Sequence, residues 1–168
     1  MYPSTGSGQA LLDGAKSLNV LDIWIKARYN QLLKQVEEAI EKYELDRAAR
    51  PIDEFIDDLS NWYVRRSRNR FKSDDEQDRN WAVATTREIL IGLAKVMAPF
   101  TPFVAEEVYG KLAGSGSRES VHLESWPAAE SFDEKIIANM AKARELTEVG
   151  LALRDKAGIK VRQPLNTA

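Results

Sequence analysis

The chain has 168 residues, of which 43% are hydrophobic and 30% are charged, a balance that is typical of one globular domain with its own core. The formal net charge is -2, so binding to a nucleic acid would have to rely on a local basic patch. Cysteine is absent, which excludes a disulfide framework, a thiol nucleophile and a cysteine zinc site. The sequence has neither an apolar run long enough to span a membrane nor the pattern of a signal peptide, so we expect a cytoplasmic protein without a membrane partner.

Residues 1–18 are expected to be a leader, because the opening segment MYPSTGSG is small and polar. A short helix is expected within this leader, around residues 9–17. A long helix is predicted next, from Leu21 to about Tyr43, where apolar residues recur at helical spacing. Asn19 precedes this helix and is a suitable N-cap.

A second helix is predicted from about Asp46 to Phe71. Its buried side consists of apolar residues at three- and four-residue spacing, namely Ile52, Phe55, Ile56, Leu59, Trp62 and Tyr63. Pro51 lies inside this helix, and because its ring removes one backbone hydrogen bond, a kink or a restart is expected there. The charged residues from Lys72 to Arg79 are expected to form a turn.

The segment DLSNWYVRRSRNRFK, residues 58–72, is the most informative part of the sequence, because arginine replaces the apolar stripe of the second helix. At helical spacing Arg66 and Arg70 continue the buried side. Each must reach a carboxylate, a phosphate or water, since an unpaired buried charge is costly. We expect Arg66 to be the structural arginine, paired inside the fold. The neighbouring outward face carries Arg65, Arg68 and Lys72.

Two explanations fit this basic helix end equally well. Five positive side chains with aromatic residues among them are typical of a surface that binds an RNA backbone. However, acidic residues in the first half of the helix and basic residues in its last turns also compensate the helix dipole without any ligand. The residues alone leave both explanations open.

The second half of the chain also has mostly helical patterns. Trp81–Ala98 is so apolar that it is predicted to be the central helix of a bundle, and a proline ends it. Thr101 followed by Pro102 has the order of an N-cap and a first helical residue, which predicts a helix to about Leu112. Residues 113–120, AGSGSRES, are predicted to be a loop.

The last helix is predicted to begin at a capping box formed by Ser131 and Glu134, and Gly158 is its natural stop. After it, the alternation of apolar and basic residues in IKVR predicts one strand, whose partners would lie beyond the end of the sequence. The chain therefore looks cut at its C-terminal edge.

Residues that would carry out catalysis are missing. His122 is the only histidine, and in VHLESWP it is expected to face solvent or to satisfy a turn. No second histidine is present to share a metal, and the glycines at 114 and 116 lack the spacing of a phosphate-binding loop. We therefore predict no catalytic residue, metal or cofactor in this chain, and the residues by themselves indicate an all-helical module with one basic helix end.

The segment DLSNWYVRRSRNRFK closely resembles the signature helix of the anticodon-binding domain of isoleucyl-tRNA synthetase, a class I aminoacyl-tRNA synthetase. Further segments resemble the same domain in the same order: LDIWIKARYNQLL, LDRAAR, MAPFTPFVAEEVY, VHLESWP and AGIKVRQPL. Together they cover nearly everything after about Asn19. The third and fourth are shared with the valine enzymes, whereas AGIKVRQPL and RRSRNRF are similar to the isoleucine enzyme specifically.

The resemblance implies an all-α fold, a helical bundle of the class I synthetase anticodon-binding type over residues 19–157. Residues 158–168, with the short strand, would begin a truncated C-terminal junction region. The parent enzyme would ligate isoleucine to its tRNA with ATP and magnesium in a separate catalytic domain. This chain has neither the HIGH and KMSKS motifs nor the editing insertion, so we expect it to be inactive alone.

The resemblance also implies partners and site residues. The partners would be the anticodon stem and loop of an isoleucine tRNA and the missing catalytic, editing and C-terminal domains, and the protein would be a monomer. Phosphates would be contacted by Arg65, Arg68 and Lys72, and anticodon bases by Asn69, Arg70 and Phe71. By analogy with the related methionine enzyme, Asn30 and Lys34 are secondary candidates, for which ordinary helix surface is the competing explanation.

Two other functions remain open at this point. One is the anticodon-binding domain of a valine-type synthetase. The other is a helical protein-interaction module, in which the order of acidic and basic residues only compensates the helix dipole.

Overall fold

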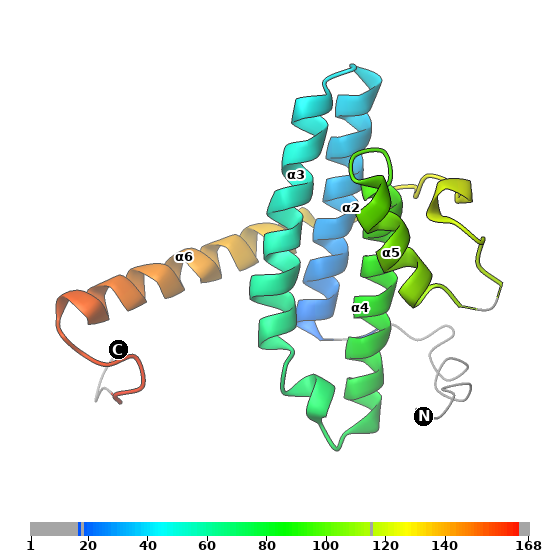
Figure 1. Cartoon of the computed structure of the whole chain (residues 1–168). Coiled ribbons are helices and arrows are strands. Elements are labelled where there is room, and N and C mark those ends of the chain that lie inside the picture. The colour runs from blue at the N-terminus through cyan, green and yellow to red at the C-terminus, as the bar shows by residue number, and fades with distance from the viewer. Residues whose placement is uncertain (1–16, 18, 115, 165–168) are drawn as a thin grey trace. The chain divides into compact units, whose positions relative to one another are not determined.

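The computed structural model describes residues 17, 19–114 and 116–164, so the predicted leader and its short helix lie outside the described residues except for Ser17. Within this part of the chain the regular elements are helices and there is no strand, which confirms the all-α prediction. The chain divides into two compact units, Met1–Phe132 and Asp133–Ala168. In the first unit α2, α3 and α4 lie side by side, and α5 packs along α4 (Figure 1).

The first long helix, α2 (Val20–Glu41), confirms the prediction made from its apolar spacing. Its N-cap is Asn19, whose side-chain oxygen accepts the backbone N–H of Leu21 at 3.0 Å. Its buried residues face the other helices and include Trp24, Ile25, Leu32, Leu33 and Val36. This face forms one wall of the core.

A tight reversal joins α2 to α3 (Leu45–Asp57). The N–H groups of Tyr43 and Glu44 donate to the carbonyls of Ile40 and Ala39, each at 2.9 Å, so the last carbonyls of α2 are satisfied by backbone alone. This pattern requires a left-handed residue, and Tyr43 adopts a φ of 59°. The helix was predicted to extend to about Tyr43, but Tyr43 lies in the turn after it and is 92% exposed.

The second predicted helix is divided into different helical forms. Pro51 lies within α3, which continues across it, so the helix does not restart there. The irregularity comes later, where the π-helix η1 (Asp58–Val64) follows α3 directly. The 3-10 helix η2 (Arg70–Lys72) then completes the segment. A π-helix contains about one more residue per turn than an α-helix, and this shifts the side chains that follow it around the axis.

The central helix α4 (Glu76–Met97) begins earlier than the predicted Trp81, so the charged turn is shorter than expected. The reason is a good N-cap: the carboxylate of Asp75 accepts the N–H groups of Gln77 and Asp78. Gly92 lies where α4 meets α2, and a Cβ at this position would overlap with the hydroxyl group of Tyr29. Glycine is therefore required by the close approach of the two helices.

The helix α5 (Pro102–Leu112) confirms the predicted helix. Thr101 takes the N-cap position, but its side chain makes no capping hydrogen bond. At the other end, the guanidinium of Arg87 donates twice to the carbonyl of Leu112, at 3.0 and 2.8 Å, and so satisfies the C-terminus. A short 3-10 helix, η3 (Val121–Leu123), folds back onto α5 and buries Val121 in a small core.

The second unit contains α6 (Glu134–Lys156). Its N-cap is Asp133 rather than the predicted Ser131, since the Asp133 carboxylate accepts the N–H of Lys135 at 2.8 Å. Gly158, with a φ of 67°, ends it as predicted. None of the described residues of α6 is buried.

The strand predicted after α6 is wrong. Residues 161–162 form a turn, in which the N–H of Gln163 donates to the carbonyl of Lys160 at 2.9 Å. The guanidinium of Arg154 donates to the carbonyls of Lys160 and Gln163, at 3.1 and 2.9 Å. A strand needs the backbone groups of a neighbouring strand. In the part of the chain that is described, these carbonyls bind an arginine from the preceding helix instead.

Candidate nucleic-acid interface

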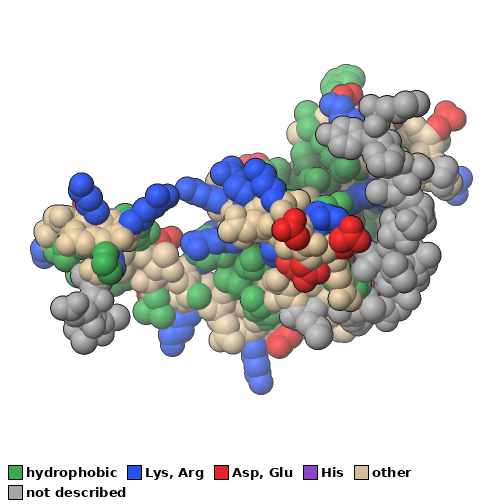
Figure 2. All heavy atoms as spheres, turned by 90° about the horizontal axis from the view of Figure 1, so that it is seen from below, with side chains coloured by type: hydrophobic (Ala, Val, Ile, Leu, Met, Phe, Trp, Pro, Cys, Tyr) green, Lys and Arg blue, Asp and Glu red, His purple; other side chains and the backbone are tan. Residues whose placement is uncertain are grey.

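The segment singled out in the sequence lies at one end of the helical bundle, where η1 and η2 lead into α4 (Figure 1). Four of its basic side chains are exposed: Arg65, Arg66, Arg68 and Lys72. We call these four residues the basic cluster. Figure 2 looks at this end of the bundle and shows Lys and Arg side chains gathered beside a group of Asp and Glu side chains. Positive side chains are therefore concentrated in one place, although the net charge of the whole chain is -2.

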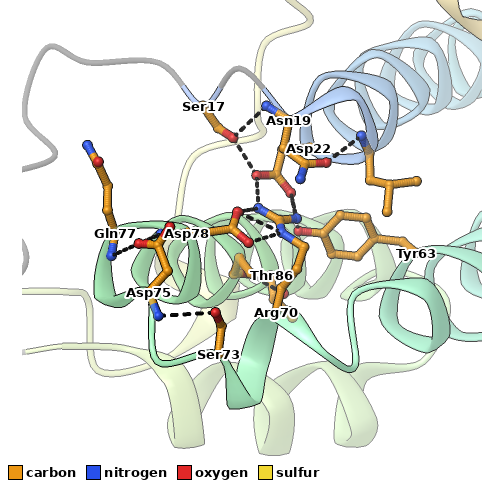
Figure 3. Close-up of polar contacts among 12 residues, drawn as sticks. Ser17, Asn19, Asp22, Tyr63, Arg70, Ser73, Asp75, Gln77, Asp78 and Thr86 are labelled. Atoms are coloured by element: carbon orange, nitrogen blue, oxygen red, sulfur yellow. Dashed lines mark hydrogen bonds and ion pairs between the residues drawn. The ribbon is translucent and has the colours of Figure 1, made fainter.

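Arg70 differs from its neighbours, because its guanidinium is held between two carboxylates (Figure 3). Its two terminal nitrogens donate to the two oxygens of Asp22, at 2.7 and 2.8 Å. Its Nε donates to the carboxylate of Asp78 at 2.9 Å. The side chain of Arg70 is 11% exposed and that of Asp22 only 1%. Arg70 thus ties η2 to the first turns of α2 and α4.

Two hydroxyl groups complete the surroundings of Asp22. The hydroxyl of Tyr63 donates to one carboxylate oxygen at 2.7 Å, and that of Ser17 donates to the other at 2.5 Å. We call Asp22, Arg70, Asp78, Tyr63 and Ser17 the Asp22 network. Every member provides a charge or a hydrogen bond, which is the condition under which a buried ion pair is tolerated.

The network keeps Asp22 charged. Burial alone would raise the pKa of Asp22, but the hydrogen bonds from Arg70, Ser17 and Tyr63 outweigh burial and hold this pKa below its ordinary value. The hydrogen bonds and charges of Asp22 and Asp78 raise the pKa of Arg70 in turn, despite its partial burial. Burial and the adjacent carboxylate also raise the pKa of the Tyr63 hydroxyl. At neutral pH, therefore, Asp22 and Arg70 are charged and the Tyr63 hydroxyl is neutral.

A second ion pair anchors the π-helix. Nε of Arg28, on α2, lies 2.8 Å from the carboxylate of Asp58, and the two side chains are 14% and 9% exposed. Arg28 also donates to the side-chain oxygen of Gln31. The start of η1 is thus held to the middle of α2, while Arg70 holds the end of the segment.

The π-helix also decides which arginine faces the interior. Tyr63 is fully buried, as expected for a core residue, and the next buried residue is Ser67, four positions later. Phe55, Leu59, Tyr63 and Ser67 are buried at successive steps of four residues, which is wider than the 3.6 residues per turn of a regular α-helix. Three regular α-helical turns after Phe55 would have brought Arg66 inward, whereas here it is exposed. The prediction that Arg66 is the structural arginine is therefore wrong, and Arg70 has that role.

The other residues predicted at this helix end lie close to the basic cluster in the chain. Asn69 is exposed, and its carbonyl accepts the N–H of Lys72 at 3.2 Å. Phe71 is partly buried, and its N–H donates to the carbonyl of Ser67 at 3.1 Å. The structure thus places Asn69, Phe71 and Lys72 on one short turn.

Comparison with known proteins shows the family. Residues 22–168 match the family described as the anticodon-binding domain of tRNA ligase. The chain belongs to this family.

Curated relatives of this anticodon-binding domain are named isoleucine–tRNA ligases. The chain is 42% identical over 154 residues to the one from Streptomyces avermitilis and 42% identical over 147 residues to the one from Deinococcus radiodurans. It is 38% identical over 160 residues to the one from Clostridium tetani. These alignments cover 89, 86 and 90% of the chain but only 14, 14 and 15% of the relatives. The chain therefore spans about one seventh of their length.

The two secondary candidates lie elsewhere on the anticodon-binding domain. With a rise of 1.5 Å per residue, Asn30 and Lys34 are about 12 and 18 Å further along α2 than Asp22. Lys34 is exposed. The side chain of Asn30 donates to the carbonyl of Lys26 at 3.0 Å and accepts the N–H of Glu130 at 2.7 Å. The structure does not bring these two residues to the basic cluster.

The sequence prediction missed the acidic partners in this domain. Neither Asp22 nor Asp78 was among the predicted site residues. One signal was available: Asp22 lies three residues before Ile25 on the apolar side of α2, and an acid at such a position needs a partner.

The described part of the domain has neither a metal-binding cluster nor a membrane-spanning helix. There, no group of three or more His, Asp or Glu side chains could hold a metal ion. No described helix is long and apolar enough to cross a membrane.

Proposed function

We propose that this chain is the anticodon-binding domain of an isoleucine–tRNA ligase, and that its basic cluster binds the anticodon stem and loop of an isoleucine tRNA. The observation that carries the proposal is an exposed group of cations on a segment that buried ion pairs hold in place at both ends. The relatives named isoleucine–tRNA ligases support the choice of amino acid, since they match along most of the chain. They favour isoleucine over a valine-type enzyme.

Two kinds of contact with RNA are proposed. Arg65, Arg68 and Lys72 neutralise backbone phosphates, which releases counterions and makes the affinity fall with salt. Asn69 and Phe71 contact unpaired bases of the loop, which can splay out to stack or to form hydrogen bonds.

Arg70 acts in this proposal mainly as a positioning residue. Its guanidinium already donates to two carboxylates, so most of its hydrogen-bonding capacity is used within the fold. It orders the turn that carries the basic cluster and Asn69, which reduces the entropy lost when RNA binds. Asn30 and Lys34 form a secondary surface on α2.

The remaining properties follow from the parent enzyme. We propose a cytoplasmic monomer in which the catalytic domain, with ATP and magnesium, and the editing and C-terminal domains lie outside this chain. The helices described above would be a bundle of the class I synthetase type. The chain alone would bind tRNA without charging it.

The test is a binding titration of this chain with an isoleucine anticodon stem-loop and with a scrambled loop, at about 50 and 200 mM salt. Replacing Arg65, Arg68 and Lys72 together by alanine is expected to abolish loop-selective binding. The slope of log affinity against log salt should also become less steep by about 2 to 3, since each phosphate contact contributes about 0.7 to 0.9.

A matched control removes the same charge from the opposite end of the bundle. Lys42, Arg47 and Arg50 are exposed near the turn between α2 and α3. Their triple replacement by alanine should leave the affinity within about twofold, which is less than 0.5 kcal/mol. Equal losses in both triple variants, or equal binding of both loops, would contradict a specific site at the basic cluster and would favour non-specific attraction. No binding at low salt would favour a protein-interaction module.

A further inference from the structure

The π-helix brings two side chains together on the surface. Trp62 lies within η1, and Arg66 follows it by four residues. The guanidinium carbon of Arg66 lies over the Trp62 ring, 4.4 Å from its centroid. Arg66 is exposed and Trp62 is partly buried. In this pair the partly buried Trp62 ring therefore lies beneath, and the exposed guanidinium of Arg66 covers it on the solvent side.

The chemistry of this pair suits a flat ligand. A guanidinium is planar, and when one face is stacked on an aromatic ring its other face can stack on a second ring. Unpaired RNA bases stack on aromatic side chains and on guanidinium planes. An ion pair with a phosphate needs neither a plane nor a supporting tryptophan, so the stacking contact points to a base.

The position of the pair within the basic cluster supports the same ligand. Arg65 precedes Arg66 directly, and Arg68 follows two residues later, and both are exposed. Cations that hold an RNA backbone on either side would keep the bases of that strand within reach of Arg66. Its contact in the structure is with an aromatic ring, whereas Arg70 is held by two carboxylates.

We propose that Trp62 and Arg66 form a stacking platform for one unpaired base of the bound RNA, with Arg66 as the layer that contacts the base. This inference rests on the proposed function, because the basic cluster must first bring the RNA strand to this surface. It assigns to Arg66 a role in base binding and to Trp62 the role of a positioning residue beneath it.

The first test is the substitution Arg66→Lys, which keeps the positive charge but removes the plane. Arg50→Lys is the matched control at an exposed arginine near the opposite end of the bundle, outside the basic cluster. Both variants are titrated with the isoleucine anticodon stem-loop and with a set of loops that lack one base each. Arg66→Lys is expected to weaken binding of the complete loop about tenfold, as expected for one lost stacking contact, without changing the salt slope. Arg50→Lys should change the affinity less than twofold.

The loops that lack a base locate the contact. For one of them, the difference between wild type and Arg66→Lys should disappear, because the base that the arginine plane would stack on is gone. If Arg66→Lys is as harmless as Arg50→Lys, or if its effect is the same with every loop, the platform is disproved and Arg66 is only a charge. If the wild-type chain binds no stem-loop, the proposed function fails and the platform fails with it.

A second readout separates stacking from loss of folding. A 2-aminopurine base at the sensitive position should lose fluorescence when the wild-type chain binds, and it should remain brighter in the complex with Arg66→Lys at saturation. The variant Trp62→Phe retains a smaller ring and should give an intermediate quench. Unfolding midpoints of the Arg66→Lys and Arg50→Lys variants should match that of the wild type, because both side chains are exposed. Unchanged quenching in Arg66→Lys would overturn the inference.

Discussion

The two ends of the α2–α3 pair hold the chain by different means. At one end Asp22 is 1% exposed, and Arg70, Tyr63 and Ser17 donate to it. At the other end the chain reverses at Tyr43, which is 92% exposed and has a φ of 59°. Side chains fix the first end and backbone hydrogen bonds fix the second. A buried charge must have all of its partners, whereas an exposed turn can retain an unfavourable backbone conformation.

The C-terminus of α6 ends with the same backbone hydrogen bonds as the C-terminus of α2. The N–H groups of Gly158 and Ile159 donate to the carbonyls of Asp155 and Arg154, which is the same arrangement that ends α2. There the left-handed position is occupied by glycine, which has no Cβ to clash. The same backbone pattern is therefore relaxed at Gly158 and strained at Tyr43.

The largest expected effect is the loss of stability when the Asp22 network is disrupted. Arg70→Ala leaves the carboxylate of Asp22 without its cation, and removing one member of a buried ion pair costs about 3 to 5 kcal/mol. Urea unfolding of the variant measures the loss. The control is Arg47→Ala, which removes an exposed ion pair with Glu44 near the other end and should change stability by less than about 0.5 kcal/mol. Equal effects of the two substitutions would show that the Asp22 network does not hold this end.

The second prediction concerns acid. Because the pKa of Asp22 is lower in the folded protein than in the unfolded chain, this residue contributes stability above the unfolded value of about 4. That contribution is lost as the pH falls through the folded pKa. Denaturant unfolding as a function of pH should therefore show a steeper loss of stability below about pH 4 in the wild type than in Asp22→Asn. Parallel curves would mean that the Asp22 carboxylate is not stabilised by the fold.

The smallest expected effect is a gain in stability when the left-handed residue Tyr43 is replaced by glycine. Tyr43→Gly relieves a left-handed conformation that costs a residue with a Cβ about 1 to 2 kcal/mol, and part of this gain is offset by the flexibility of glycine in the unfolded chain. A net gain of about 0.5 to 1 kcal/mol is expected in thermal or urea unfolding. Tyr43→Ala keeps the Cβ and should give no such gain. If alanine stabilises as much as glycine does, the exposed ring rather than the backbone is unfavourable.

Several helix ends could be predicted because they depend on neighbouring residues only. Asn19 caps α2, Pro102 begins α5 and Gly158 ends α6, as their residue types indicate. The predicted capping box of Ser131 and Glu134 is not the start of α6, because Asp133 caps this helix instead. The basic residues of the candidate site were also apparent from the sequence.

The sequence by itself thus determined an all-helical chain with most of its helix ends, and it located the segment that carries the basic cluster. Only the tertiary structure decided which arginine is buried. Arg66, which follows the π-helix η1, is exposed, and Arg70 pairs with Asp22 and Asp78 on two other helices. The strand failed for a related reason, since pairing depends on a partner that local alternation cannot supply. Contacts between distant segments depend on how the whole chain packs, and no local pattern contains that information.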